Sequence, residues 1–345
     1  MVESAIETRT GFGERPRVVP WRRAECRTER LCTALLAVFF AGCLATDVVA
    51  ADARKTAGAD PMKTVAPPLS FDTDRVKREI SAFLESRKSR SGLLPSFSDT
   101  ATTSFANETG RFHDVYHQKL GYLDDGAYTY DLALAIMGFL LNGQQEDAER
   151  ILNLLEREFY MEKNGTRGLY NSYKVNDNYT KDDLAMGGDG DRMHAGPILW
   201  VAIAALNHAK LTRNTRYLEF TLDIIDWCRK ELTYYRFPDG ERGGISMGMG
   251  WGPDWTRIFS TEHNVDYYSV LQMLETLYAE SSPDVQAIFD EKKLDGAWLR
   301  DERDHIGRFL REVVFNWDLH IFNAGVTENG VDTMKILAGT SWGLG

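Results

Sequence analysis

The chain has 345 residues, of which 43% are hydrophobic and 11% aromatic, and its formal net charge is −11 at pH 7. A chain of this length and composition can bury a full-sized hydrophobic core. The acidic balance, with no long run of Lys or Arg beyond residue 50, repels phosphate backbones and argues against nucleic-acid binding.

Residues 1–50 have the pattern of an export signal. Four arginines between positions 22 and 30 precede an apolar run over 31–45, which suits a signal peptide and is short for a bilayer span. Val48-Val49-Ala50 offers a cleavage site, and Phe40 to Cys43 resembles a lipoprotein box. We expect a periplasmic or extracellular protein whose membrane contact, if it has one, is a lipid anchor at Cys43. An uncleaved signal anchor is the alternative.

The exported chain should contain one cysteine and one main domain. Cys228 is the only cysteine after residue 50, so the fold cannot rely on an internal disulfide, and its apolar surroundings predict an inert buried thiol. Residues 51–70 form a polar tether that we expect to be loose, and residues 71–345 form the folded domain.

Helical periodicity dominates this domain. Apolar spacing predicts helices over about 74–90, 127–142, 145–161, 194–211, 214–235, 262–280 and 297–315. Some are apolar almost all round, as expected of buried helices, whereas others, such as 145–161, have a polar face and belong outside.

A glycine- and acid-rich loop running into an apolar helix recurs along the chain. The predicted helix starts, at Ala127, His194, Thr261 and Val331, are separated by about 67 to 70 residues. A fixed period indicates one supersecondary unit stacked on copies of itself, here a pair of antiparallel helices. Parallel inner helices would bring the four loops to one mouth, so we expect an all-α barrel of helical hairpins with a pocket there.

Aromatic side chains are concentrated in these loops. The segment from Gly243 to Trp255 combines five glycines with Trp251 and Trp255, so that backbone and flat rings can approach a ligand. With Tyr128 and Tyr173, these tryptophans are the predicted stacking surfaces for a sugar ring. Packing in the barrel core is the alternative for each single ring.

The segment from Ser260 to Asp266, followed by an apolar helix to Leu277, resembles the bacterial six-hairpin glycosidase-like superfamily, which has an (α/α)6 barrel. The segments from His194 to Pro197 and from Gly330 to Thr333 also resemble that superfamily in their residues and in their order along the chain. The likeness covers about residues 75–345, or four of six hairpins, and implies a barrel incomplete at the C-terminus. It also implies a carbohydrate-active enzyme, since the superfamily includes glycoside hydrolases, unsaturated glucuronyl hydrolases and sugar 2-epimerases.

The predicted chemistry is glycoside hydrolysis of a poly- or oligosaccharide, which needs one protonated and one ionised carboxyl group. Glu262 is the first candidate, and the dipole of its helix should keep it ionised as a base. Asp131 is the predicted acid, because partial burial would raise its pKa. Structural roles, as a first-turn glutamate and a buried aspartate, are the alternatives.

Other residues complete the predicted site and open further hypotheses. His194, His263 and Asp266 should shape the pocket, and Asp125 is a helix cap or a substrate contact. The two histidines could instead exchange the proton beside a sugar carbonyl, as in a 2-epimerase, although export disfavours that function. A non-catalytic glycan-binding or scaffold protein is the third hypothesis. No metal or other cofactor is predicted, because no run matches a ligand spacing.

Overall fold

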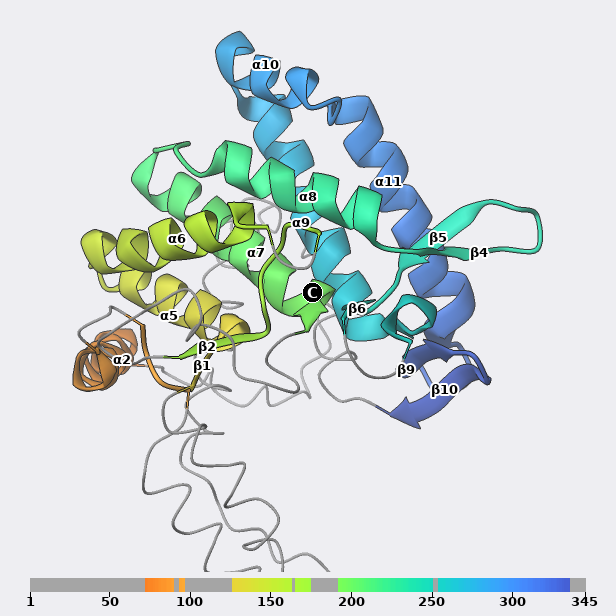
Figure 1. Cartoon of the computed structure of the whole chain (residues 1–345), viewed down its shortest axis with the longest axis horizontal. Coiled ribbons are helices and arrows are strands. Elements are labelled where there is room, and N and C mark those ends of the chain that lie inside the picture. The colour runs from red at the N-terminus through yellow and green to blue at the C-terminus, as the bar shows by residue number, and fades with distance from the viewer. Residues whose placement is uncertain are drawn as a thin grey trace, which may run out of the picture. The chain divides into compact units, whose positions relative to one another are not determined.

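Helices make up most of the described chain in the computed structural model (Figure 1), which confirms the predicted all-α class of helical hairpins. The structure describes residues 72–89, 93–96, 126–162, 165–174, 192–250 and 254–335. The predicted export signal, the tether and Cys43 lie outside these residues. No helix of the described part is long and apolar enough to cross a membrane.

Three helical hairpins follow one another along the chain. Their helices are α5 (Thr129–Leu141) with α6 (Gln145–Tyr160), α7 (Ala195–Thr212) with α8 (Leu218–Glu231), and α9 (Thr261–Glu280) with α11 (Gly296–Phe309). A short helix, α10 (Pro283–Glu291), joins the last pair, and α2 (Thr73–Arg87) packs against α5. The first helices of the hairpins lie side by side, α5 against α7 and α7 against α9 (Figure 1).

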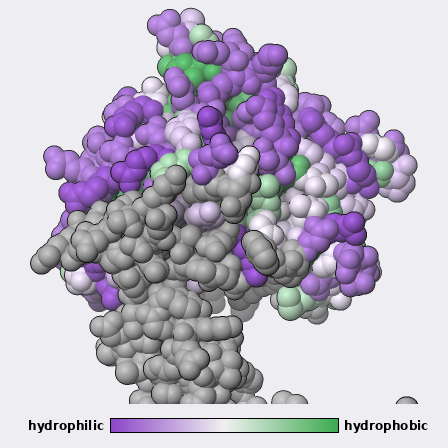
Figure 2. All heavy atoms as spheres, viewed as in Figure 1, coloured by the Kyte–Doolittle hydropathy of each residue, from purple (hydrophilic) through white to green (hydrophobic). Residues whose placement is uncertain are grey.

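Apolar patterning explains which helix of each pair lies inside. Most of α7, from Ile198 to His208, is buried, whereas α6 buries one face and exposes charged residues on the other. The described surface in the same view is mostly hydrophilic over the outer helices (Figure 2). Cys228 of α8 is fully buried, and burial raises the pKa of its thiol, as expected of an inert cysteine.

Short strands lead into the inner helices and pair with the loops that follow. β1 (Gly126–Tyr128) pairs with β2 (Ser172–Lys174), β3 (Met193–His194) with β6 (Gly248–Met249), and β7 (Phe259–Ser260) with β9 (Ile321–Thr327), all antiparallel. The remaining strands are β4 (Tyr234–Arg236), β5 (Arg242–Ile245), β8 (Phe315–Asn316) and β10 (Gly330–Lys335). A 3-10 turn spans Trp255–Arg257, and a π-helical turn, Leu310–Val314, follows α11.

Loop carbonyls satisfy amides at the starts of the inner helices. The N–H of Thr129 donates to Asn171 (2.9 Å), and the N–H of Ala195 donates to Met247 (2.9 Å). Beside the second contact, Gly248 has a φ of 158°, and a Cβ there would lie 2.3 Å from the carbonyl oxygen of Met193. Only glycine allows β6 to approach β3 this closely.

The predicted repeat is present, but its period is shorter than predicted, and the described residues contain three copies instead of four. The inner helices begin at Thr129, Ala195 and Thr261, 66 residues apart in both steps. The predicted helix at Val331 is wrong: Glu328-Asn329 forms a two-residue turn, and Val331 lies in β10, paired with Val326. The β-branched residues Val326, Thr327 and Val331 on both sides of this turn favour strands, and Gly330 has a φ of 102°, which favours glycine.

Smaller corrections concern helix boundaries. The N-cap residue of α5 is Tyr128, and its side chain makes no capping hydrogen bond. Helix α10 is not among the predicted helices, although Ser282 before Pro283 is the residue pair expected at a helix start. The predicted helix start at Thr261 is confirmed.

Candidate active site

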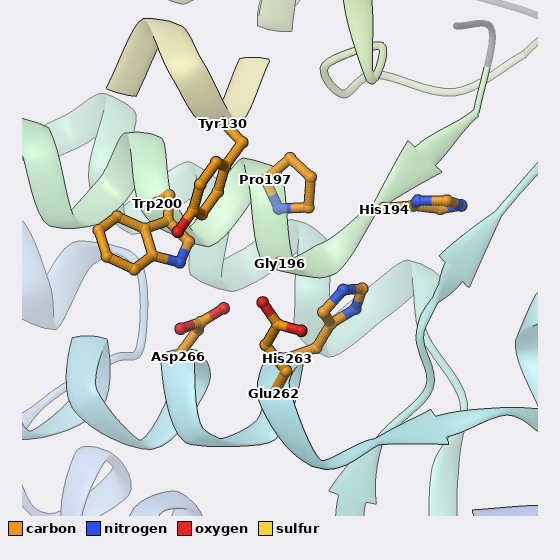
Figure 3. Close-up of a pocket in the computed structure, with 8 residues that line it drawn as sticks. All are labelled: Tyr130, His194, Gly196, Pro197, Trp200, Glu262, His263 and Asp266. Atoms are coloured by element: carbon orange, nitrogen blue, oxygen red, sulfur yellow. The ribbon is translucent and has the colours of Figure 1, made fainter. Parts of the chain in front are cut away.

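A cavity of about 250 Å³ opens at the N-terminal ends of the three inner helices (Figure 3). Its lining residues share this location, and they are Tyr130, His194, Gly196, Pro197, Trp200, Glu262, His263 and Asp266. The site predicted at the mouth therefore contains a cavity, and four of the predicted residues line it: Glu262, Asp266, His194 and His263.

The 66-residue repeat explains why these residues meet. Tyr130, Gly196 and Glu262 are each the second residue of an inner helix, and Trp200 and Asp266 are each the sixth. Residues four apart on a helix share one face, so positions two and six of neighbouring helices line the same space. The cavity is thus made of equivalent positions that carry different side chains.

Glu262 and Asp266 form a carboxyl pair on α9. Both side chains rise from this helix toward Tyr130 and Trp200 (Figure 3). Burial raises the pKa of Glu262, which is opposite in direction to the effect expected from the helix dipole. Burial also raises the pKa of Asp266 well above its usual range, and the nearby charge of Glu262 adds to this, against a contact with Trp200 that lowers it.

The titrations of these two carboxyl groups are therefore coupled. Asp266 is 4% exposed and Glu262 is half-buried, so Asp266 retains its proton to higher pH than Glu262 does. Within the described part of the chain, no Lys or Arg forms an ion pair with either carboxyl group. The arrangement offers one protonated and one ionised carboxyl group beside the same cavity.

Two histidines lie beside the carboxyl pair. The ring centroids of His194 and His263 are 6.2 Å apart. Burial lowers the pKa of His263 to about 3, helped by the nearby His194. His263 is therefore neutral at physiological pH and able to accept a proton or a hydrogen bond.

Aromatic rings surround the opposite side of the cavity. Tyr130 and Trp200 meet edge to face, with ring centroids 5.0 Å apart. Trp255 does not line the described cavity, but its ring lies 4.9 Å from that of His194, and the guanidinium of Arg192 lies 5.0 Å from its centroid. Trp255 is consequently placed beside the site with Arg192 over its ring.

The remaining predicted residues have different positions. Asp131 does not line the described cavity; burial raises its pKa, the predicted direction, and a hydrogen bond with Ser96 opposes this. Tyr128 is half-buried before α5 and also does not line it. The prediction that Tyr173 stacks on a sugar is wrong, because its side chain is fully buried and its hydroxyl accepts from the N–H of Tyr170 (3.1 Å). Asp125 and Trp251 lie outside the described residues.

Trp200 lines the cavity but is not among the predicted site residues. The signal was available, since Trp200 precedes Asp266 by one 66-residue repeat and therefore occupies the same helical position. It was overlooked because a tryptophan inside an apolar helix matches the expectation for core packing.

The described side chains do not form a recognisable metal site. No group of three or more His, Cys, Asp or Glu residues that could hold a metal ion occurs among them.

Comparisons with known proteins give weak structural likenesses. No protein-family model and no curated protein matches this sequence. A sugar epimerase from a ruminal bacterium is similar over 60% of this chain and 50% of its own length, at 14% identity and a TM-score of 0.40. An unsaturated glucuronyl hydrolase from a Bacillus species is similar over 78% of this chain and 66% of its own, at 13% identity and a TM-score of 0.45.

An endo-beta-1,4-glucanase from Acetobacter xylinum covers 76% of this chain and 65% of its own, at 8% identity and a TM-score of 0.42. The chain thus spans half to two thirds of the length of these three proteins.

Proposed function

We propose that this chain is a carbohydrate-active enzyme, and that it is a glycoside hydrolase acting on a poly- or oligosaccharide. The observation that carries the proposal is the carboxyl pair of Glu262 and Asp266 at a cavity that aromatic rings also line. Carboxyl groups supply the acid and base of glycoside hydrolysis, and aromatic rings pack against the apolar faces of sugars.

The protonation states suggest how the pair would divide the work. Asp266, the more buried group, keeps its proton and would donate it to the leaving glycosidic oxygen. Glu262 ionises first and would take a proton from the attacking water. Because both come from α9, the sugar would have to bind with its glycosidic bond beside this helix and its ring toward Tyr130 and Trp200.

The histidine pair favours a second candidate, a sugar isomerase of the 2-epimerase kind. His194 and His263 both line the cavity, with ring centroids 6.2 Å apart. Such an enzyme would move a proton at the carbon beside the carbonyl of a ring-opened sugar. Incorporation of deuterium from heavy water into a free reducing sugar would support it.

Release of reducing ends by the full chain, across a panel of bacterial and plant glycans, tests the proposed hydrolase. Glu262→Gln should lower kcat about 100-fold or more, the usual contribution of an acid–base group. Glu280→Gln makes the same chemical change at an exposed position of the same helix and should be silent. Undiminished turnover by Glu262→Gln would refute the role of this carboxyl group. Binding without turnover by the wild-type chain would indicate a glycan-binding protein.

A further inference from the structure

The backbone N–H and carbonyl of Met247 contact residues at the starts of two inner helices. Its N–H donates to the carbonyl of Ile258 (2.6 Å), and its carbonyl oxygen accepts the N–H of Ala195 at the start of α7 (2.9 Å). The same oxygen lies 3.1 Å from Nδ1 of His263 on α9. This backbone group therefore ties a catalytic-cavity histidine to the framework of the neighbouring helix.

The contact with Met247 defines the tautomer of His263. A carbonyl oxygen can only accept, so Nδ1 must carry the proton that is shared with it. Since burial keeps the ring neutral, with a pKa lowered to about 3, the other nitrogen has an unprotonated lone pair. Within the described part of the chain, no donor reaches this Nε2 atom.

Gly196 leaves the space in which Nε2 sits. A Cβ at Gly196 would lie 2.7 Å from Nε2 and 2.5 Å from Cδ2 of His263. The equivalent positions of the other inner helices carry the side chains of Tyr130 and Glu262, and both line the cavity. The edge of the His263 ring therefore occupies the place of a missing cavity-lining side chain, and this brings its nitrogen to the wall (Figure 3).

We propose that Nε2 of His263 is a fixed hydrogen-bond acceptor for a substrate hydroxyl group, set by the Met247 carbonyl and by the space at Gly196. This inference rests on the proposed carbohydrate substrate and names the atom that binds it. An unprotonated nitrogen attracts hydroxyl donors and repels anionic oxygens. In this role His263 binds the substrate, and Met247 and Gly196 position it.

Nitrogen NMR of the histidine-labelled full chain tests the state of the ring without a substrate. We expect a signal from a neutral ring with protonated Nδ1 and unprotonated Nε2, unchanged from about pH 5 to about pH 8, assigned by its loss in His263→Asn. A ring protonated at Nε2, or a cation within this range, would overturn the inference.

Two variants separate substrate binding from structural support. His263→Asn can retain the donor to Met247 but lacks an acceptor at Nε2, whereas His263→Gln can place an amide oxygen there. On the glycan that the wild-type chain hydrolyses, His263→Asn should raise KM about 3- to 10-fold. The KM of His263→Gln should be close to that of the wild-type chain. His320→Asn, at an exposed position, is the matched control.

An unchanged KM in a folded His263→Asn variant would overturn the proposed role. Failure of the proposed function has a different signature: no glycan is hydrolysed by the wild-type chain, while the NMR signals still show an unprotonated Nε2. That result would refute the hydrolase and support the assigned state of the ring.

Discussion

The carboxyl group of Glu302 on α11 and the carboxyl pair on α9 have opposite environments. Glu302 of α11 is fully buried, and it accepts hydrogen bonds from the hydroxyl groups of Tyr234 (2.5 Å) and Tyr267 (3.1 Å). It also forms an ion pair with Arg242 at 2.9 Å. Tyr267 directly follows Asp266 in the chain, so adjacent residues of one helix serve these two different sites.

Asp266 and Glu262 lack comparable neutralisation. Trp200 contacts Asp266, but no described Lys or Arg pairs with either group, and the pKa of both is raised. A buried carboxylate that has a cation and donors supports the fold, whereas one without them costs stability and remains available for chemistry. The comparison assigns Glu302 to structure and the α9 pair to the site.

Removal of the Glu302 carboxyl group should give the largest loss of stability. Glu302→Ala leaves two tyrosine hydroxyls without their acceptor and removes the buried one of the two carboxylates that pair with Arg242, so we expect the free energy of unfolding to fall by about 3 kcal/mol. Urea unfolding measures this change. Asp301→Ala is the matched control, because the exposed Asp301 also pairs with Arg242 (3.0 Å), and its loss should cost under about 1 kcal/mol. Equal losses would contradict the structural role of Glu302.

Asp266→Asn should change stability in the opposite direction. Because burial raises the pKa of Asp266 in the folded state, the folded chain binds this proton more tightly than the unfolded chain does. Stability therefore falls as pH rises from the unfolded pKa of about 3.9 toward the raised folded value, by about 1.4 kcal/mol for each unit between them. The amide cannot ionise and avoids this loss.

Thermal unfolding checks the sign of that effect. The Tm of Asp266→Asn should exceed that of the wild-type chain at pH 7, and the difference should shrink toward pH 4, while turnover is lost at pH 7. A variant that is less stable than the wild-type chain at pH 7 would place Asp266 in the structural class with Glu302.

The fold was largely predictable because the repeat leaves a local signal. The inner helices α5 and α7 are apolar almost all round, and each inner helix follows a loop that contains glycines and acids, so their positions could be read without tertiary contacts. The prediction failed at Val331, where the same glycine- and acid-rich signal precedes β10 instead of a helix. Loop composition alone does not distinguish a helix start from a hairpin turn, whereas the β-branched residues around it do.

Residues near the helix starts could be predicted as site residues, but the contacts of individual side chains could not. Glu262, His263 and Asp266 follow directly from a helix start at the mouth, and all three line the cavity. Tyr173 was placed there because it is aromatic and close to a loop, yet it packs in the core, and a ring in either place has the same sequence signature. The Met247 contact with His263 was not predictable, since any residue provides a backbone carbonyl.

The smallest predicted effect, that of Asp131→Asn on kcat, tests whether Asp131 or Asp266 is the acid that acts with Glu262. The carboxyl group of Asp131 contacts Ser96, and Asp131 does not line the described cavity, whereas Asp266 does. Asp131→Asn should therefore lower kcat less than about 10-fold, whereas Asp266→Asn should lower it about 100-fold or more. Steady-state kinetics on one glycan compares the two variants. If Asp131→Asn has the larger effect, the acid comes from α5, and the sugar must bind between α5 and α9, with one carboxyl group on each side of its glycosidic bond.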